Sequence, residues 1–479
     1  MTKRFCYSAL TMCLCASAGT LAQTTPPQPP SDVVRLTLHD AEQLGLKDNP
    51  QISVAKLLTL AQHQVTRETR SAELPSATAN LTAVDAHEGT RITAGVLNNP
   101  SVFQRAGAGI AIGQLITDFG RTQNLVASAV LNEKAQQQSE LATAADVTLA
   151  VDRAFYSALG AQAELLVAQQ TVNARQTTAD QVQALAKAKL RSDLDLSFAN
   201  VNLAQAKLLL LDAQNRKDAA FADLNEILGF EKQTTYLLVD ETTTCGQQCS
   251  GTPCGGAPSD RSSCGCWGEG SGGCLPGSCP TVESGCVPKP PDNQEDLVQQ
   301  ALRSRPDLAA IDDQWQAQQR FARAEHELNR PNISALAAVG GTPVRADQIT
   351  TPWYGAVGVN MSIPIFNGFL FSGRAHEADL RAGALQQQTR DVRDRIARDV
   401  RVTWLEANTA YQRVSVTAQL LQQASLALDL AQTRYNLGLS SIVELSQAQL
   451  QQTDAQIGNT NARYAYLSTL SVLRFQVGQ

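Results

Sequence analysis

The segment DLSFANV, Asp195–Val201, has a counterpart in the second half of the chain in ELSQAQL, Glu444–Leu450. The same register continues without a gap and pairs Phe155 with Trp404, Ala206 with Ala455, Leu224 with Leu473 and Gly229 with Gly478. Earlier in each half, Asn49-Pro50 matches Arg305-Pro306, and Leu74-Pro75 matches Arg330-Pro331. Ordered matches of this kind are typical of an internal repeat. The sequence therefore predicts one structural unit that occurs twice.

Each half is expected to begin with a helix, over residues 38–73 and 295–329, that ends before a proline. Two extended segments follow in each half, over residues 76–86, 106–116, 333–339 and 357–365. In the last of them apolar residues alternate with small or polar ones, at Val357, Val359, Met361, Ile363 and Ile365. This alternation predicts strands with two unlike faces, in a membrane or in a small soluble sheet.

Residues 121–189 and 373–437 contain no proline and almost no glycine. A helix of roughly 60 residues is about 90 Å long and needs partners along its side. In the second of these segments a seam at spacings of three and four runs through Val414, Thr417, Leu421, Ala424, Leu428, Ala431 and Tyr435. The first-half matches are Leu165, Ala168, Val172, Arg175, Ala179, Val182 and Ala186, of which only Arg175 is out of character. The pattern predicts coiled-coil packing through small residues.

Each long helix is predicted to reverse. In the second half Asn436-Leu437-Gly438 is typical of a helix end with glycine in the left-handed position, and Ser440-Ser441 can cap the next helix. The first-half equivalent, Lys189-Leu190-Arg191-Ser192, keeps the serine but lacks the glycine. We expect the return helices to continue to Gly229 and Gly478.

The N-terminus resembles a secretory signal peptide over residues 1–22. Basic residues precede a short apolar run that is too short to span a bilayer, and Thr20-Leu21-Ala22 offers a cleavage site. Lipid attachment at Cys13 or Cys15 is a lesser alternative, because the residues just before them are a poor fit. After residue 22 no apolar stretch is long enough for a transmembrane helix, so only a closed β-barrel would place this chain in a membrane.

The sequence shows no pattern of charged or catalytic residues that is typical of an enzyme. The net charge of -6 gives no electrostatic case for nucleic-acid binding. The 5 histidines show no metalloprotease or nucleophile–base spacing, and no phosphate-binding loop is present. We therefore expect no catalytic residue, no cofactor and no metal site.

Residues at the second reversal and at the end of the last strand resemble the TolC-like outer-membrane efflux protein family. The similarity rests on Arg434–Leu439 with Ile442–Leu445, on Ile363–Gly368, and on the two-fold repeat. The resemblance implies an α+β membrane protein with a periplasmic α-barrel of long antiparallel hairpins. It implies a homotrimer in which each chain gives four strands to one transmembrane β-barrel in outer-membrane lipid. Independently, four strands alone cannot close a barrel, so their edges need other copies.

The family also has a constriction at the periplasmic tip, formed by acidic side chains and held shut by a tyrosine and an arginine. By position, Glu444 takes the inner acidic place and Tyr435 the tyrosine's place. Ser440 stands where the family has the arginine and Gln447 where it has a second acid, so this chain departs from the family pattern.

By the repeat, Arg191 matches Ser440 and Asp195 matches Glu444. We therefore expect Arg191 to pair with Asp195 or Glu444 across neighbouring hairpins in a closed tip. The alternative is that these are solvated helix-end charges, with Asp195 favouring a helix N-terminus. A ring of acidic residues from several copies would favour cations at the constriction.

The same tip is the predicted docking surface for a periplasmic adaptor. Its residues are Leu190, Leu437, Gly438, Leu439 and Ser440. The alternative is that the leucines fold inward as a local hydrophobic cap beside the left-handed turn.

Between the halves lie eight cysteines in a Gly-, Ser- and Pro-rich segment: Cys245, Cys249, Cys254, Cys264, Cys266, Cys274, Cys279 and Cys286. An even number in an exported chain favours disulfides over a thiolate metal site. The segment cannot form an apolar core of its own, so crosslinks would hold it.

The expected organisation is a signal peptide at 1–22, a Pro-rich linker at 23–37, repeat one at 38–230, a Cys/Gly-rich insertion at 240–292 and repeat two at 293–479. The expected function is the outer-membrane exit duct of a tripartite efflux pump for small molecules, with an adaptor and an inner-membrane transporter as partners. The alternatives are the outlet of a type I protein secretion system and, of another class, a non-conducting periplasmic coiled-coil scaffold.

Overall fold

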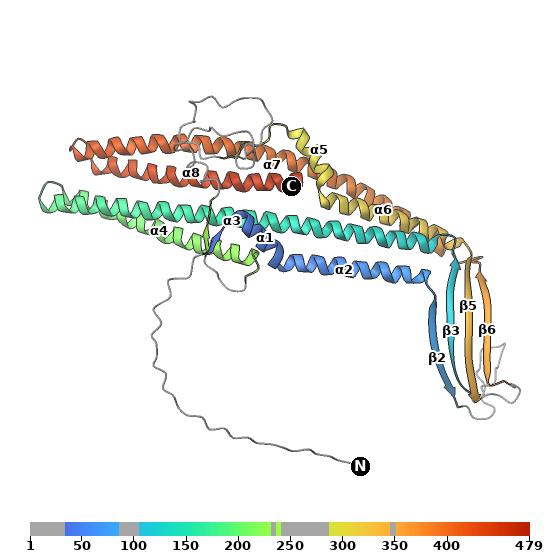
Figure 1. Ribbon diagram of the computed structural model, residues 1–479. Helices are drawn as coiled ribbons and strands as arrows, with labels where there is room; N and C mark the ends of the chain where they lie inside the picture. The colour runs from blue at the N-terminus through green and yellow to red at the C-terminus, as the bar shows by residue number, and fades with distance from the viewer. Residues whose placement is uncertain (1–33, 86–104, 231–235, 241–286, 345–350) are drawn as a thin grey trace, which may run out of the picture.

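The computed structural model describes residues 34–85, 105–230, 236–240, 287–344 and 351–479. These residues form an elongated helical bundle with a sheet at one end and two helical reversals at the other (Figure 1). In both halves of the chain two short helices are followed by two strands and then by two long helices. Apart from the division of the opening helix into two, this order of elements is the one that the duplicated sequence predicts.

The first half contains β1 (Val34–Leu36), α1 (Leu38–Asp48), α2 (Pro50–Arg70), the 3₁₀ turn η1 (Ser71–Glu73), β2 (Ser76–Val84), β3 (Arg105–Thr117), α3 (Arg121–Lys187), α4 (Asp193–Ile227) and β4 (Tyr236–Leu238). The second half contains α5 (Gln294–Ser304), α6 (Pro306–His326), η3 (Glu327–Asn329), β5 (Asn332–Val344), β6 (Trp353–Ser362), α7 (Leu370–Asn436) and α8 (Ile442–Val477). Most predicted boundaries lie within a few residues of these.

The opening helix of each half is broken, and its prediction as one continuous helix was wrong. The break lies between α1 and α2 at Asn49 and between α5 and α6 at Arg305, where ψ is 127° and 123°. The next residue in each case is a proline at the first helical position, where its missing N–H does no harm. Because a proline disfavours helical backbone in the residue before it, the chain turns at these points.

In each half, the break in the opening helix contacts the end of the return helix. Asn49 donates from Nδ2 to the carbonyl oxygen of Ile227 at 2.8 Å, and Ser304 donates from Oγ to the carbonyl oxygen of Val477 at 2.6 Å. Gly229 and Gly478, which follow those carbonyls, have φ of 79° and 82°. The end of each return helix is therefore fixed against the break in its own half.

Alanine in place of Gly229 is expected to destabilise the fold by about 1–3 kcal/mol, because alanine disfavours positive φ. Its Cβ would also lie 2.6 Å from the carbonyl oxygen of Asp48. The measurement is the thermal unfolding midpoint of the detergent-purified full chain. Gly458→Ala is the control, since Gly458 lies inside α8 with nothing within 4 Å of its Cβ position. Equal midpoints for the two variants would contradict the expectation.

The larger sheet is antiparallel and has the order β2-β3-β5-β6. Its registers place Val357 beside Ala337 and Val359 beside Ala335. On that face the neighbours are mainly apolar, whereas Ser334, Asn360 and Ser362 lie on the opposite face. The edge strands β2 and β6 each pair on one side only, and all ten residues of β6 are exposed.

The predicted strand over residues 357–365 ends earlier than expected. β6 stops at Ser362, before Pro364, so Ile363 and Ile365 lie beyond the sheet. A proline cannot donate to a ladder of hydrogen bonds, which accounts for the early end. The prediction extended too far because Ile363 and Ile365 continue the alternating pattern beyond the end of the strand.

A second, small sheet lies at the middle of the bundle (Figure 1). Here β1 pairs in parallel with β4, and Leu36 lies beside Leu238 in a cluster that includes Phe155 and Leu224. The predicted linker over residues 23–37 therefore reaches too far, because its last residues form a strand. The pairing also ties the start of the first half to the segment that follows α4.

The long helices α3 and α7 have 67 residues each, which corresponds to about 100 Å. α3 packs against α4, α6 and α8, and α7 packs against α6 and α8. The predicted seam lies on the inner side of both helices: Ala424, Ala431 and Tyr435 are buried in α7, and Arg175, Ala179 and Val182 in α3. Among the described helices, none combines the length and the apolar character needed to cross a bilayer.

Candidate functional site at the helical tip

The two reversals have the same backbone geometry. In the second, Gly438 has φ of 76°, and the N–H of Leu439 donates to the carbonyl oxygen of Arg434 at 2.8 Å. In the first, Lys189 occupies the matching place with φ of 57°, and the N–H of Leu190 donates to the carbonyl oxygen of Leu185 at 2.9 Å. The predicted helix end at Gly438 is confirmed, and Lys189 adopts the left-handed conformation without being a glycine.

Serine side chains start both return helices, as predicted. The Oγ of Ser192 accepts from the N–H of Asp195 at 3.2 Å, and the carboxylate of Asp195 accepts in return from the N–H of Ser192 at 3.4 Å. This is a capping box. The Oγ of Ser441 accepts from the N–H of Glu444 at 3.4 Å. Within the chain, Asp195 therefore stabilises the start of α4.

Arg191 connects the two hairpins. Its Nη2 donates to the backbone carbonyl oxygen of Tyr435 at 2.8 Å, and its guanidinium carbon lies 4.4 Å from the centre of the Tyr435 ring. Stacking of a guanidinium on an aromatic face is attractive. Within one chain, the partner of Arg191 is thus Tyr435 rather than the expected Asp195 or Glu444. An ion pair of Arg191 between subunits stays a prediction.

Glu444 pairs within its own hairpin, with Arg434 at 3.2 Å. Both side chains are exposed, so the pair contributes little to stability. Sequence reasoning missed this partner, although Arg434 lies in the last turn of α7 and Glu444 in the first turn of α8, across a short reversal. That proximity was the signal that could have identified it.

A cluster of buried residues supports the Arg191 contact from below. It contains Ala179, Val182, Ala199, Leu203, Tyr435, Ile442 and Leu445, from α3, α4, α7 and α8. Burial raises the pKa of the Tyr435 hydroxyl, and the positive charge of Arg191 opposes that shift. The hydroxyl is buried and has no hydrogen-bond partner among the described residues. Tyr435 therefore holds its place by packing and by its contact with Arg191.

The predicted docking leucines lie exposed at the very end of the bundle. Leu190, Leu437 and Leu439 are 70%, 69% and 67% exposed, Gly438 is exposed, and Ser440 is half-buried. In the single chain these leucines do not fold inward as a hydrophobic cap, which was the alternative. These three exposed leucines lie on the two reversals, and we call them the tip leucines.

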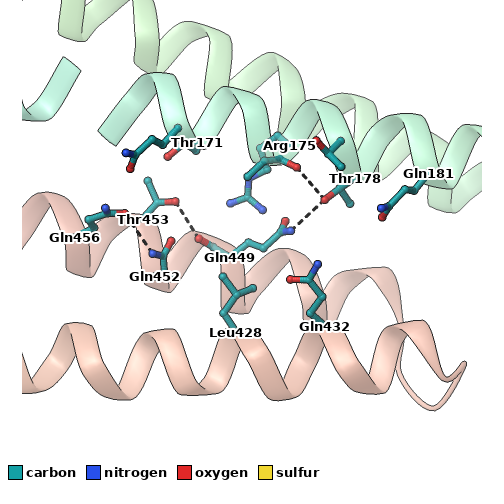
Figure 2. A pocket seen from close by; sticks show the side chains of 13 residues that line it. Thr171, Arg175, Thr178, Gln181, Leu428, Gln432, Gln449, Gln452, Thr453 and Gln456 are labelled. Atoms are coloured by element: carbon teal, nitrogen blue, oxygen red, sulfur yellow. Dashed lines mark hydrogen bonds between the residues drawn. The ribbon is translucent and has the colours of Figure 1, made fainter. Parts of the chain in front are cut away.

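Further along the shaft, a polar cavity of about 400 Å³ lies between the two hairpins (Figure 2). Arg175 of α3 faces Gln449 of α8 across it. The amide of Gln449 donates to the Oγ1 of Thr178 at 3.4 Å. Sequence reasoning recorded Arg175 as out of character on the seam but assigned it no role.

The eight cysteines from Cys245 to Cys286 lie outside the described residues. Their pairing stays a prediction. In the part of the chain that is described, no group of three or more His, Cys, Asp or Glu residues is arranged to hold a metal ion.

The family model for outer membrane efflux proteins matches residues 43–230 and 297–479. The chain belongs to the outer membrane efflux protein family. The two matched ranges correspond to the two halves described above, and the interval between them contains the cysteine-rich segment. The place of an efflux protein of this family is the outer membrane, with a long helical part in the periplasm.

Two curated relatives support the family. The outer membrane protein TolC of Salmonella enteritidis is 23% identical over 122 residues, which are 26% of this chain and 25% of that protein. TolC of Vibrio cholerae is 25% identical over 122 residues. The matched segment thus spans about a quarter of each relative.

Solved structures show the same fold over nearly the whole chain. The transmembrane channel CusC has a TM-score of 0.72 at 15% identity, with 93% of each chain covered. The outer membrane protein VceC of Vibrio cholerae has a TM-score of 0.69 at 15% identity, with 92% of this chain and 96% of that chain covered. The outer membrane channel MtrE of Neisseria gonorrhoeae, in its open state, has a TM-score of 0.70 at 17% identity. At these identities the likeness concerns the fold.

Proposed function

We propose that three copies of this chain form an outer-membrane exit duct of a tripartite efflux pump, through which small molecules leave the cell. The observation that carries the proposal is the four-stranded sheet. Within the described part of the chain its two edge strands are unpaired on their outer sides, and it lies at the end of a bundle about 100 Å long. Such edges invite pairing with further strands.

The faces of the sheet support a shared barrel of twelve strands. One face is lined mainly by apolar residues and the other carries Ser334, Asn360 and Ser362, which is the alternation of a barrel with a lipid side and a wet side. Trp353 begins β6 on the mainly apolar face, at the end of the strand, where a barrel strand has its aromatic girdle. Pairing β2 of one copy with β6 of the next would leave no edge free.

Native mass spectrometry of the detergent-purified chain tests the assembly, with three chains per particle as the expected result. Planar bilayers test conduction. A monomeric particle without channel current would overturn the proposal and favour a non-conducting scaffold. Deleting the gene would then separate the two export functions: sensitivity to small toxic solutes supports the pump, whereas loss of one secreted protein supports the secretion outlet.

The tip residues have two roles in this proposal. Arg191, Tyr435, Asp195 and Glu444 form the gate, in which Arg191 keeps the two hairpins of each chain together. The tip leucines, with Gly438 and Ser440, dock a periplasmic adaptor that works with an inner-membrane transporter. Exposure of the leucines in the single chain supports docking, because large apolar patches on a surface often mark contact sites.

Leu439→Asp is expected to abolish the function of the pump while leaving the channel assembled, because a charge among the tip leucines would be desolvated on docking. The measurements are solute sensitivity of the cells and the amount of oligomer in the outer membrane. Leu426→Asp is the control, since Leu426 is also exposed, at 54% against 67% for Leu439, but lies on the shaft of α7, away from the tip. Equal sensitivity of the two variants would remove the tip leucines from docking.

A further inference from the structure

Among the residues that the structure describes, Arg175 is a buried positive charge without a counterion. Its side chain is only 7% exposed, and its Nη1 has no hydrogen-bond partner among the described residues. None of the ion pairs of the described chain includes it. Burial lowers the pKa of Arg175 to about 10, so the guanidinium remains protonated at neutral pH. A buried charge with no partner is unfavourable unless something else compensates it.

The surroundings of Arg175 are built for hydrogen bonding rather than for apolar packing. Apart from Arg175, the cavity of about 400 Å³ is lined by six glutamines, four threonines, an alanine and a leucine. Arg175 is thus its only charged residue. Figure 2 shows the guanidinium between α3 and α8, directed toward Gln449. The long 3.4 Å bond from Gln449 to Thr178 leaves that amide free to turn toward a ligand.

The seam itself does not require an arginine. The position equivalent to Arg175 in the second repeat is Ala424, which is also buried, on α7. An alanine there satisfies close helix packing at no electrostatic cost. The charge of Arg175, and not its bulk, is therefore the feature that packing leaves unexplained.

Asp454 is an acidic candidate for a counterion. It lines a second hollow, on the α4 side, which Arg175 also borders. Asp454 is exposed and does not form an ion pair with Arg175 within the described chain. The first cavity contains no acidic residue at all.

We propose that this cavity binds a small oxyanion, of the phosphate or carboxylate type, on the Arg175 guanidinium and the amide of Gln449. A guanidinium fork matches the two oxygens of such an anion. The volume accommodates a polyatomic anion together with water molecules. Because Arg175 belongs to α3 and Gln449 to α8, the bound anion links the two hairpins. This proposal does not depend on the proposed channel function.

Isothermal titration of the full chain in detergent with inorganic phosphate tests the site, and a separate titration uses acetate. The wild type is expected to bind at least one of them. Arg175→Gln is expected to weaken binding about tenfold or more, since it removes a charged hydrogen-bond donor. Arg175→Lys keeps the charge but loses the fork, so an intermediate affinity is expected.

Two controls separate this site from general electrostatics. Arg413→Gln removes an exposed positive charge elsewhere on α7 and should leave the affinity unchanged. Asp454→Asn should leave it unchanged or raise it, because a nearby negative charge is lost. Circular dichroism checks that each variant keeps its helices. The proposal is overturned if the wild type binds neither anion, or if Arg175→Gln binds as tightly as Arg413→Gln.

Discussion

Arg191→Ala is expected to raise the resting conductance of the reconstituted channel by about tenfold or more. The variant removes the hydrogen bond of Nη2 to the carbonyl of Tyr435 and the stacking on its ring. A hydrogen bond from a charged group contributes about 1.5–3 kcal/mol, and 1.4 kcal/mol corresponds to a factor of ten in an equilibrium constant. The closed arrangement of the tip would lose that amount in every subunit.

The position of the contact explains why conductance is the sensitive measurement. Arg191 lies just before α4 and Tyr435 lies in the last turn of α7, so the contact joins the two hairpins within a few residues of their reversals. In the proposed gate, opening of the tip would separate the hairpins there. Below the contact the apolar cluster holds Tyr435 in place, so the fold itself should tolerate the loss.

Two variants make this expectation specific. Arg434→Ala removes an ion pair that lies within one hairpin, and it should change the conductance much less. Arg191→Lys keeps the charge but cannot stack as a planar group, so an intermediate conductance is expected. Unchanged conductance of Arg191→Ala would remove Arg191 from the gate.

Patterns along the sequence were sufficient for most of the fold. The absence of proline predicts the extent of α3 and α7, and the spacing of the seam predicts which side of each helix is buried. These signals are reliable because every residue of a long helix obeys the same period. The break before Pro50 and the early end of β6 were missed, since in both places a proline outweighed a pattern that continued past it.

The site was predicted less well, because its contacts join residues far apart in the sequence. Asp195 was recognised as favouring a helix start, which the capping box bears out. The contact of Arg191 with Tyr435 depends on how the two hairpins pack, and no local pattern encodes it. Arg175 illustrates the opposite case: it was visible as an exception on the seam, but its missing partner could be recognised only in three dimensions.

Val357→Arg is expected to reduce the assembled channel in the outer membrane severely. Val357 lies in the middle of β6 and is 89% exposed in the single chain. Its cross-strand neighbour is Ala337, and both lie on the mainly apolar face. An arginine on the lipid side of a barrel costs about 2–4 kcal/mol at the centre of the bilayer. A trimer would carry this cost three times, and the total is comparable with the folding free energy of an ordinary protein.

Ala356→Arg is the matched control, because Ala356 is the preceding residue of the same strand and points to the opposite face. That face would line the water-filled interior, where an arginine keeps its hydration and should change ion selectivity rather than assembly. The measurement is the amount of oligomer in outer-membrane fractions. Equal losses in both variants would mean that β6 does not have one lipid face and one wet face. Because the shared barrel requires that difference, such a result would contradict the barrel as well as the orientation of the strand.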